Sequence, residues 1–144
     1  MTTAVDIADA VVSELNNSEA GFSLDFTAER ILLPYFEQKD LVSLKVTVVP
    51  SEVSYSSLSR SSVLAEYGID VAVQKKVNVG SDDDIETLIG LTKEIADYLR
   101  RKKLALADYA CWARSQISPL YSVEHLLDHK VFTSVVKISY KTAE

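Results

Sequence analysis

The chain has 144 residues, of which 47% are hydrophobic and 25% charged, and its net charge at pH 7 is −6. This is the length of one domain and the composition of an ordinary globular protein. The disordered class is therefore excluded, and no disulfide or metal is needed for stability. The longest basic run, residues 100–103, closes a predicted helix, where cations complement the helix dipole. An acidic chain with so short a run is poorly suited to grip a phosphate backbone, so nucleic-acid binding is not expected as its main function.

The first part of the chain predicts one helix and two strands. Residues 2–17 form an amphipathic helix, because apolar residues recur at spacings of three and four. A strand is predicted over 28–36, with Pro34 at an edge or a bulge, and another over 44–49, where apolar residues alternate. The expected core stripe of the helix consists of Val5, Ala8, Val12 and Leu15.

The most unusual segment is residues 51–62, in which seven of the twelve residues are serine. A segment of this composition buries little apolar surface, so it is predicted to be an exposed, mobile loop. A connection of about twelve residues inside a compact domain is long enough to suggest a functional role.

The second part of the chain predicts a strand, a helix and two more strands. Residues 67–73 alternate between apolar and polar side chains, which indicates a strand with one buried and one solvated face. After a turn over 78–83, Ser81 and Asp84 form a capping box that opens a long helix. Strands are then expected over 112–117 and 132–140.

This order of elements predicts a single α+β domain spanning residues 1–144. The expected architecture is an antiparallel (mixed) sheet of four to five strands with two α-helices packed on one face. Near-continuous Val/Ile strands, which are typical of a doubly wound parallel sheet, do not occur.

The sequence contains no motif of a nucleotide-binding or hydrolytic enzyme, since its four glycines are scattered and no G-x-S-x-G elbow occurs. The one site-like cluster is Glu124, His125, Asp128 and His129, in which two histidines four residues apart could hold Zn²⁺ with a carboxylate. Because the H-E-x-x-H pattern is missing, a solvated helical turn is the favoured interpretation. We therefore expect no enzyme, catalytic residue, cofactor or metal. A small metal-binding or enzymatic domain using His125 and His129 is the alternative of another class.

The single cysteine and the chain start bear on the cellular compartment. Cys111 cannot form an intramolecular disulfide and lies in the apolar stretch 109–113, so it is expected to be a small core hydrophobe. Residues 1–6 have neither a positive n-region nor an apolar h-region, and no apolar stretch approaches the ~18 residues of a membrane span. A protein kept in a reducing cytoplasm, or in a particle assembled there, is expected, with no membrane partner.

Several segments resemble small head–tail joining (neck) proteins of tailed phages, and the order of elements is similar to that of tail terminators, including the lambda-type minor tail protein U. The segments are the opening helix, the strands LKVTVVP and YGIDVAVQKKV, the helix IETLIGLTKEIADYLRRKKL and the ending FTSVVKISYK. This resemblance implies a virion structural protein of the tail or neck, assembled in the host bacterial cytoplasm. It implies a ring, usually a homo-hexamer, that ends the tail tube and mediates head–tail joining.

The resemblance also implies the partners: other copies of the chain, a tail tube protein and a head–tail connector, with DNA passing through the ring without specific binding. Another head–tail connector or neck adaptor is the alternative within structural roles, and a cytoplasmic adaptor unrelated to phages is a third. The serine-rich segment and the turn over 75–83 are expected to become ordered on assembly. Tyrosines outside the core stripes favour an interface as well. The candidate interface residues are Glu52, Tyr55, Arg60, Lys75, Lys76, Asp82, Asp83 and Tyr98.

Overall fold

The computed structural model describes residues 4–17, 20–32, 41–78, 80 and 82–144. Within these residues the chain forms three helices and one five-stranded mixed sheet. The sheet has the order β1-β2-β3-β5-β4, in which β1 runs parallel to β2 and every other neighbouring pair is antiparallel. The predicted α+β class is confirmed. In chain order the elements are α1 (Ala4–Leu15), β1 (Ala28–Arg30), β2 (Lys45–Ser57), β3 (Val63–Lys76), α2 (Asp82–Leu99), β4 (Cys111–Ile117), α3 (Val123–His129) and β5 (Val131–Ala143).

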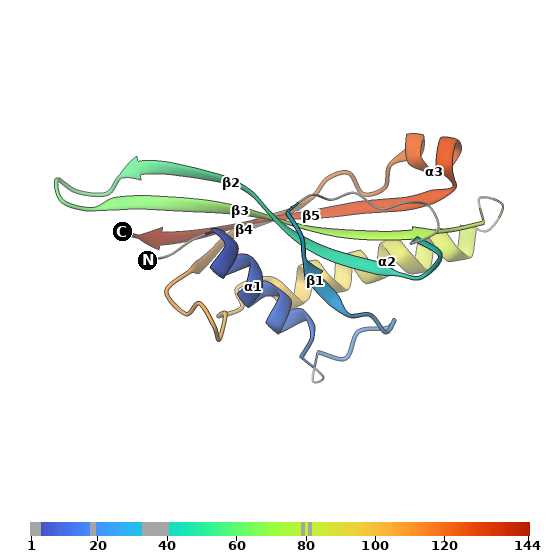
Figure 1. Ribbon diagram of the computed structural model, residues 1–144, viewed down its shortest axis with the longest axis horizontal. Helices are drawn as coiled ribbons and strands as arrows, with labels where there is room; N and C mark the ends of the chain where they lie inside the picture. The colour runs from blue at the N-terminus through green and yellow to red at the C-terminus, as the bar shows by residue number, and fades with distance from the viewer. Residues whose placement is uncertain (1–3, 18–19, 33–40, 79, 81) are drawn as a thin grey trace.

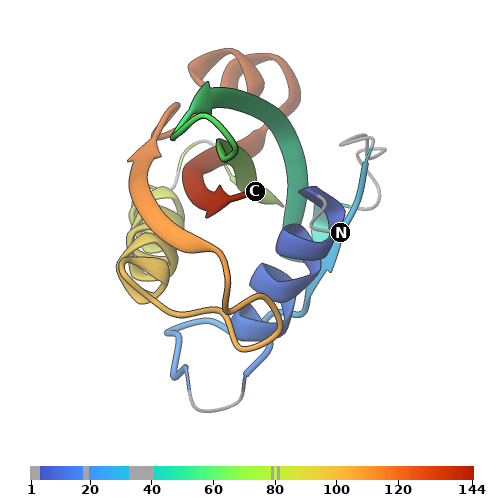
Figure 2. The ribbon, with the colours of Figure 1, turned by 90° about the vertical axis from the view of Figure 1, so that its left-hand side faces the viewer.

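The molecule is elongated, and its three longest strands run along its length (Figure 1). The turn of the β2–β3 hairpin forms one narrow end, and α3 lies at the other end. Seen along the long axis, the sheet is strongly curled (Figure 2). This curl follows from the right-handed twist of neighbouring strands, which long strands accumulate.

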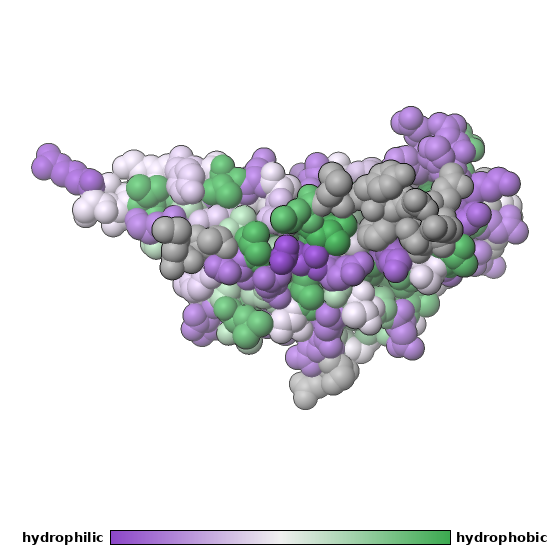
Figure 3. All heavy atoms as spheres, in the orientation of Figure 1, coloured by the Kyte–Doolittle hydropathy of each residue, from purple (hydrophilic) through white to green (hydrophobic). Residues whose placement is uncertain are grey.

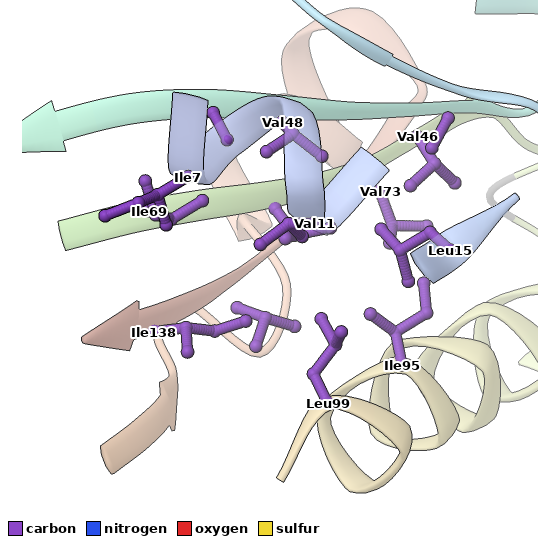
Figure 4. Packing of buried hydrophobic residues seen from close by; sticks show 14 of the residues in the cluster. Ile7, Val11, Leu15, Val46, Val48, Ile69, Val73, Ile95, Leu99 and Ile138 are labelled. Atoms are coloured by element: carbon purple, nitrogen blue, oxygen red, sulfur yellow. The ribbon is translucent and has the colours of Figure 1, made fainter. Parts of the chain in front are cut away.

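One face of the sheet carries the hydrophobic core, because side chains alternate between faces along each strand. Val48 of β2, Val71 of β3 and Val136 of β5 are fully buried and stand in register across the three strands. Both α1 and α2 pack on this face, where Val11 and Ile95 meet the strand residues (Figure 4). The prediction of two helices on one face is confirmed.

The predicted core stripe of α1 was partly wrong. Ile7 and Val11 are fully buried, whereas Val5 and Val12 are only half-buried. The three-and-four spacing fits both stripes, and the docking angle of α1 on the curled sheet selects the one that contains Ile7.

The opposite face of the sheet is mainly polar, and α3 covers it at one end (Figure 1). The hydroxyl of Ser122 accepts the backbone N–H of His125 and caps α3, while Leu126 is buried against the sheet. His125 Nδ1 lies 2.9 Å from Thr133 Oγ1 on this face. The expected helical turn before the last strand is thus a short helix.

The serine-rich segment is not a loop, which corrects the prediction for residues 51–62. β2 continues to Ser57, so Tyr55 pairs with Ala65 and Ser57 with Val63, and residues 58–62 form only the hairpin turn. The strand forms because β3 offers it a complete ladder of backbone partners. Val63, the first residue of β3, is in turn joined to Glu144 by two backbone hydrogen bonds of 2.7 Å. Exposure of the segment, which was predicted, is observed.

Other expectations are modified as well. The predicted strand 28–36 is strand only over Ala28–Arg30, and its Pro34 lies outside the described residues, as does Ser81 of the expected capping box. Cys111 is exposed rather than buried, because it pairs with Lys141 on the polar face of the sheet. No helix in the described ranges is long and apolar enough to cross a lipid bilayer.

Candidate assembly surfaces

The far half of the β2–β3 hairpin exposes a group of large apolar side chains, here called the hairpin surface. Tyr55 is 65% exposed and Leu58 55%, although both belong to a regular hairpin. A shallow hollow of about 420 Å³ lies here, lined by Tyr55, Arg60, Val63 and the neighbouring serines. The hairpin surface consists of Val53, Tyr55, Leu58 and Val63.

These side chains are exposed because the sheet is longer than the helices that cover it. Val53 and Tyr55 pair with Tyr67 and Ala65, which lie on the core face of β3. Figure 1 shows that the hairpin extends past α1, so its last residues have no helix above them. Burying a side chain such as Tyr55 against a partner would contribute about 1 kcal/mol or more. The hairpin therefore has the chemistry of a contact surface.

A second apolar group, the α3 surface, lies at the opposite end of the molecule. Leu127 is 70% exposed and Val123 55%, on the outer side of α3. Glu124 lies one turn before Leu127 and Asp128 one turn after Glu124, so the two carboxylates border the same side of α3. The apolar members of the α3 surface are Leu120, Tyr121, Val123 and Leu127.

The structure separates the predicted interface residues into groups. Tyr55 and Arg60 lie together around the hairpin hollow. Lys75 and Lys76 end β3, and Asp82 and Asp83 begin α2; these four lie at the other end of the hairpin from its turn. Tyr55 is the one apolar member of these surfaces that the sequence predicted; Val53, Leu58, Val63 and the α3 surface were not predicted. The alternation of Val53 and Tyr55 was the available signal, and the surrounding serines obscured it.

Tyr98, another predicted interface residue, is engaged within the chain. It is half-buried, and its ring meets that of Phe22 edge-on at a centroid distance of 5.3 Å. Lys102 Nζ lies 4.3 Å from the centroid of the Tyr98 ring, which is a cation–π distance. This side chain therefore anchors the segment around Phe22 to α2.

Glu52 lies at a β-bulge on the polar face, where the register of β2 shifts between Pro50 and Glu52. Its side chain crosses Gly68, and a Cβ atom at that glycine would lie 2.7 Å from Glu52 Cγ. Partial burial raises the pKa of Asp70 nearby, opposed by a hydrogen bond from Ser51 and by the charge of Lys137. The glycine at 68 is thus explained by a close approach between neighbouring strands.

The two histidines do not complete a metal site with other described residues. The ring centroids of His125 and His129 are 6.3 Å apart. Within the described part of the chain, no three His, Cys, Asp or Glu side chains converge closely enough to hold a metal ion. The alternative of a zinc site therefore finds no third ligand among these residues.

A basic depression of about 390 Å³ follows α2, beside the start of β4. Arg101 and Lys103 line it together with Asp108, Cys111 and Trp112. The Trp112 indole N–H donates to Ser115 Oγ at 2.7 Å, so the ring is held in place by its own strand. The carboxylate of Asp108 partly offsets the cations, and the depression shows no catalytic arrangement.

Comparison with known proteins adds a likeness of fold. No protein-family model and no curated protein matches the sequence. Among solved structures, the chain is similar to a chain in the virion of a native gene transfer agent particle, with a TM-score of 0.62 at 14% identity. The match covers 96% of this chain and 95% of that one. A chain from the sheath/tube terminator of an extracellular contractile injection system also matches, with a TM-score of 0.47 and 15% identity, over all of this chain and 57% of the other.

Proposed function

We propose that this protein is a non-enzymatic structural subunit of a phage-like tail, of the tail-terminator type. Copies of the chain form a ring at the head-proximal end of the tail tube, where the ring ends the tube and joins it to the neck. The partners are further copies of the chain, the tail tube protein and a head–tail connector.

The observation that carries the proposal is the pair of apolar surfaces at opposite ends of one elongated chain. The hairpin surface and the α3 surface are different, and each gathers several exposed large apolar side chains, as interaction sites do. A ring is built from such unlike surfaces, because each subunit offers one patch to the neighbour ahead and another to the neighbour behind. The acidic net charge of −6 is compatible with DNA passing through without binding.

The likeness of fold supports the virion setting of this proposal. It extends over nearly the full length of both this chain and the gene transfer agent chain, so the whole domain is the comparable unit. The injection-system match is too distant to add weight.

The test uses the purified full chain and tail tubes of the particle to which it belongs. Light scattering over a concentration series gives the mass in solution, and electron microscopy shows where the protein binds on the tubes. Ring-sized species, or monomers that bind only at tube ends, are the expected result. A strict monomer that ignores tube ends would overturn the terminator assignment, and binding to isolated necks alone would favour another connector. Stoichiometric zinc in such a monomer would favour the alternative at His125 and His129.

A further inference from the structure

We infer that the hairpin surface of one copy docks on the α3 surface of the next copy, so that the subunits join head to tail. This inference rests on the proposed self-assembly and deepens it, because it names the two halves of the contact. The occupant of each surface is therefore a second copy of this chain.

The two surfaces lie where contact between copies can cover both. Figure 1 places the hairpin turn and α3 at opposite ends of the long axis, so the surfaces cannot cover each other within one chain. In Figure 3, hydrophobic atoms (green) lie along the hairpin end and at the outer edge of the mainly hydrophilic α3 end. Two unlike patches at opposite ends are both covered when a series of copies lines up in one direction, hairpin to α3.

The charges at the exposed tips of the two surfaces are complementary. Arg60 is the only charged residue between Val53 and Val63, so the turn of the hairpin is positive, while the carboxylate of Glu144 lies at the inner edge of the surface beside Val63. The segment 120–129 contains Glu124 and Asp128 but no Lys or Arg, so the α3 surface is negative. Contact between unlike surfaces brings Arg60 to the two carboxylates, whereas hairpin-to-hairpin or α3-to-α3 contact brings like charges together.

The two surfaces also suit each other in shape. The hollow of about 420 Å³ on the hairpin is lined by Tyr55 and Val63, by five serines and by Arg60. Leu127 projects from α3 with 70% of its surface exposed, at the side of the helix that bears the carboxylates. A leucine that enters such a hollow would pack on Tyr55 and Val63 while polar and charged groups surround it, which is the usual arrangement of a protein–protein contact.

The experiment is cross-linking between two different single-cysteine variants of the full chain. Both carry Cys111→Ser; one also carries Ser57→Cys on the hairpin, and the other carries Val123→Cys on α3 together with a mass tag. A short flexible bismaleimide is added to each variant alone and to their mixture, both in solution and with tail tubes present. The expected product is a tagged–untagged dimer in the mixture only. As a control, Lys93→Cys on the exposed side of α2 replaces Val123→Cys and should give little of this product.

Charge reversal tests the pairing itself. Arg60→Glu on the hairpin variant should lower the yield of the mixed dimer roughly threefold to tenfold, because it places like charges in contact. Glu124→Lys with Asp128→Lys on the α3 variant should restore it. All of these residues are exposed, so the variants should keep the wild-type melting temperature.

The outcomes separate this inference from the proposed function. Rings or tube-end binding without a hairpin–α3 cross-link, or with efficient cross-linking of the hairpin variant to itself, would overturn the interface and leave the terminator assignment in place. Absence of both the cross-link and any assembly would overturn the two together. A mixed cross-link that charge reversal lowers and restores supports the interface.

Discussion

Tyr67 and Tyr140 are direct cross-strand partners on β3 and β5, yet among the described residues their hydroxyl groups differ in hydrogen bonding. Tyr67 Oη donates to Glu144 Oε1 at 2.8 Å. The hydroxyl of Tyr140 is fully buried and, within the described part of the chain, has no hydrogen-bond partner. Two identical side chains in one pair thus contribute differently to stability, because a buried polar group stabilises only when its hydrogen bond is made.

The Tyr67–Tyr140 pair predicts stability changes of opposite sign. Tyr67→Phe should lower the free energy of unfolding by about 1 kcal/mol, since the bond to Glu144 is lost. Tyr140→Phe should leave it unchanged or raise it by up to about 1 kcal/mol, since a buried hydroxyl without a partner is removed. Urea denaturation followed by circular dichroism measures both. Equal losses in the two variants would contradict the assignment.

The hydroxyl groups of Tyr67 and Tyr140 should make the fold less stable at alkaline pH. Burial raises the pKa of both Tyr67 and Tyr140 well above the usual 10.0, and for Tyr67 the hydrogen bond and charge of Glu144 add to the effect. The folded chain keeps these protons where the unfolded chain releases them, so stability is full below the usual pKa and falls as the pH rises past it. The melting temperature should therefore drop from roughly pH 9 to pH 11, and less steeply in Tyr140→Phe than in wild type. If the melting temperature fell equally steeply with pH in wild type and in Tyr140→Phe, the buried phenol would not be the cause.

Glu14 links α1 to the segment after α2, and its substitution should lower stability. Its carboxylate is buried and accepts the backbone N–H of Ala105 at 2.9 Å, with Lys102 Nζ 3.9 Å away. Glu14→Ala should lower the free energy of unfolding by about 1–2 kcal/mol, because that N–H loses its acceptor. Glu14→Gln keeps an acceptor and should lose less than half as much. The exposed neighbour change Ser13→Ala is the control in the same denaturation series, and equal losses from Ala and Gln would show that the bond to Ala105 is unimportant.

Substitutions at Gly68 and Glu52 should have coupled effects on the free energy of unfolding. Gly68→Ala adds a Cβ atom 2.7 Å from Glu52 Cγ and 3.1 Å from Ser51 Oγ, so we expect a cost of about 1 kcal/mol or more. In a Glu52→Ala background the nearest atom is gone, and the same substitution should cost clearly less. A double-mutant cycle by chemical denaturation measures the coupling. A cost that is the same in both backgrounds would show that the contact with Glu52 does not require glycine.

The thiol of Cys111 should react quickly in the native state. It is exposed on the polar face at the start of β4, so a chromogenic disulfide reagent should titrate one thiol without denaturant. The rate should be within roughly tenfold of that of the unfolded chain, because no opening of the fold is needed. A thiol that reacts only after denaturant is added would restore the buried assignment.

The sequence by itself determined the fold class and most elements, because these depend on local periodicity. Alternation over residues 67–73 and the three-and-four spacing up to Leu99 reflect one buried face, which any sheet with helices packed on it must provide. The short helix with His125 and His129 was also predicted, since its residues suit a solvated turn of helix. The hairpin was not predicted, because serine-rich residues have little strand preference of their own.

Only the tertiary structure decided which of these residues became surface and where. β2 extends to Ser57 because β3 supplies a ladder of hydrogen bonds, and β3 is supported in turn by β5, which lies far along the chain. Cys111 faces outward because the register of β4 aligns it with Lys141, and a bulge between Trp112 and Arg114 sets that register. The two apolar surfaces stand at opposite ends because the strands run the length of the molecule (Figure 1). Local pattern fixes which side chains are apolar, but their burial depends on what the rest of the chain is long enough to cover.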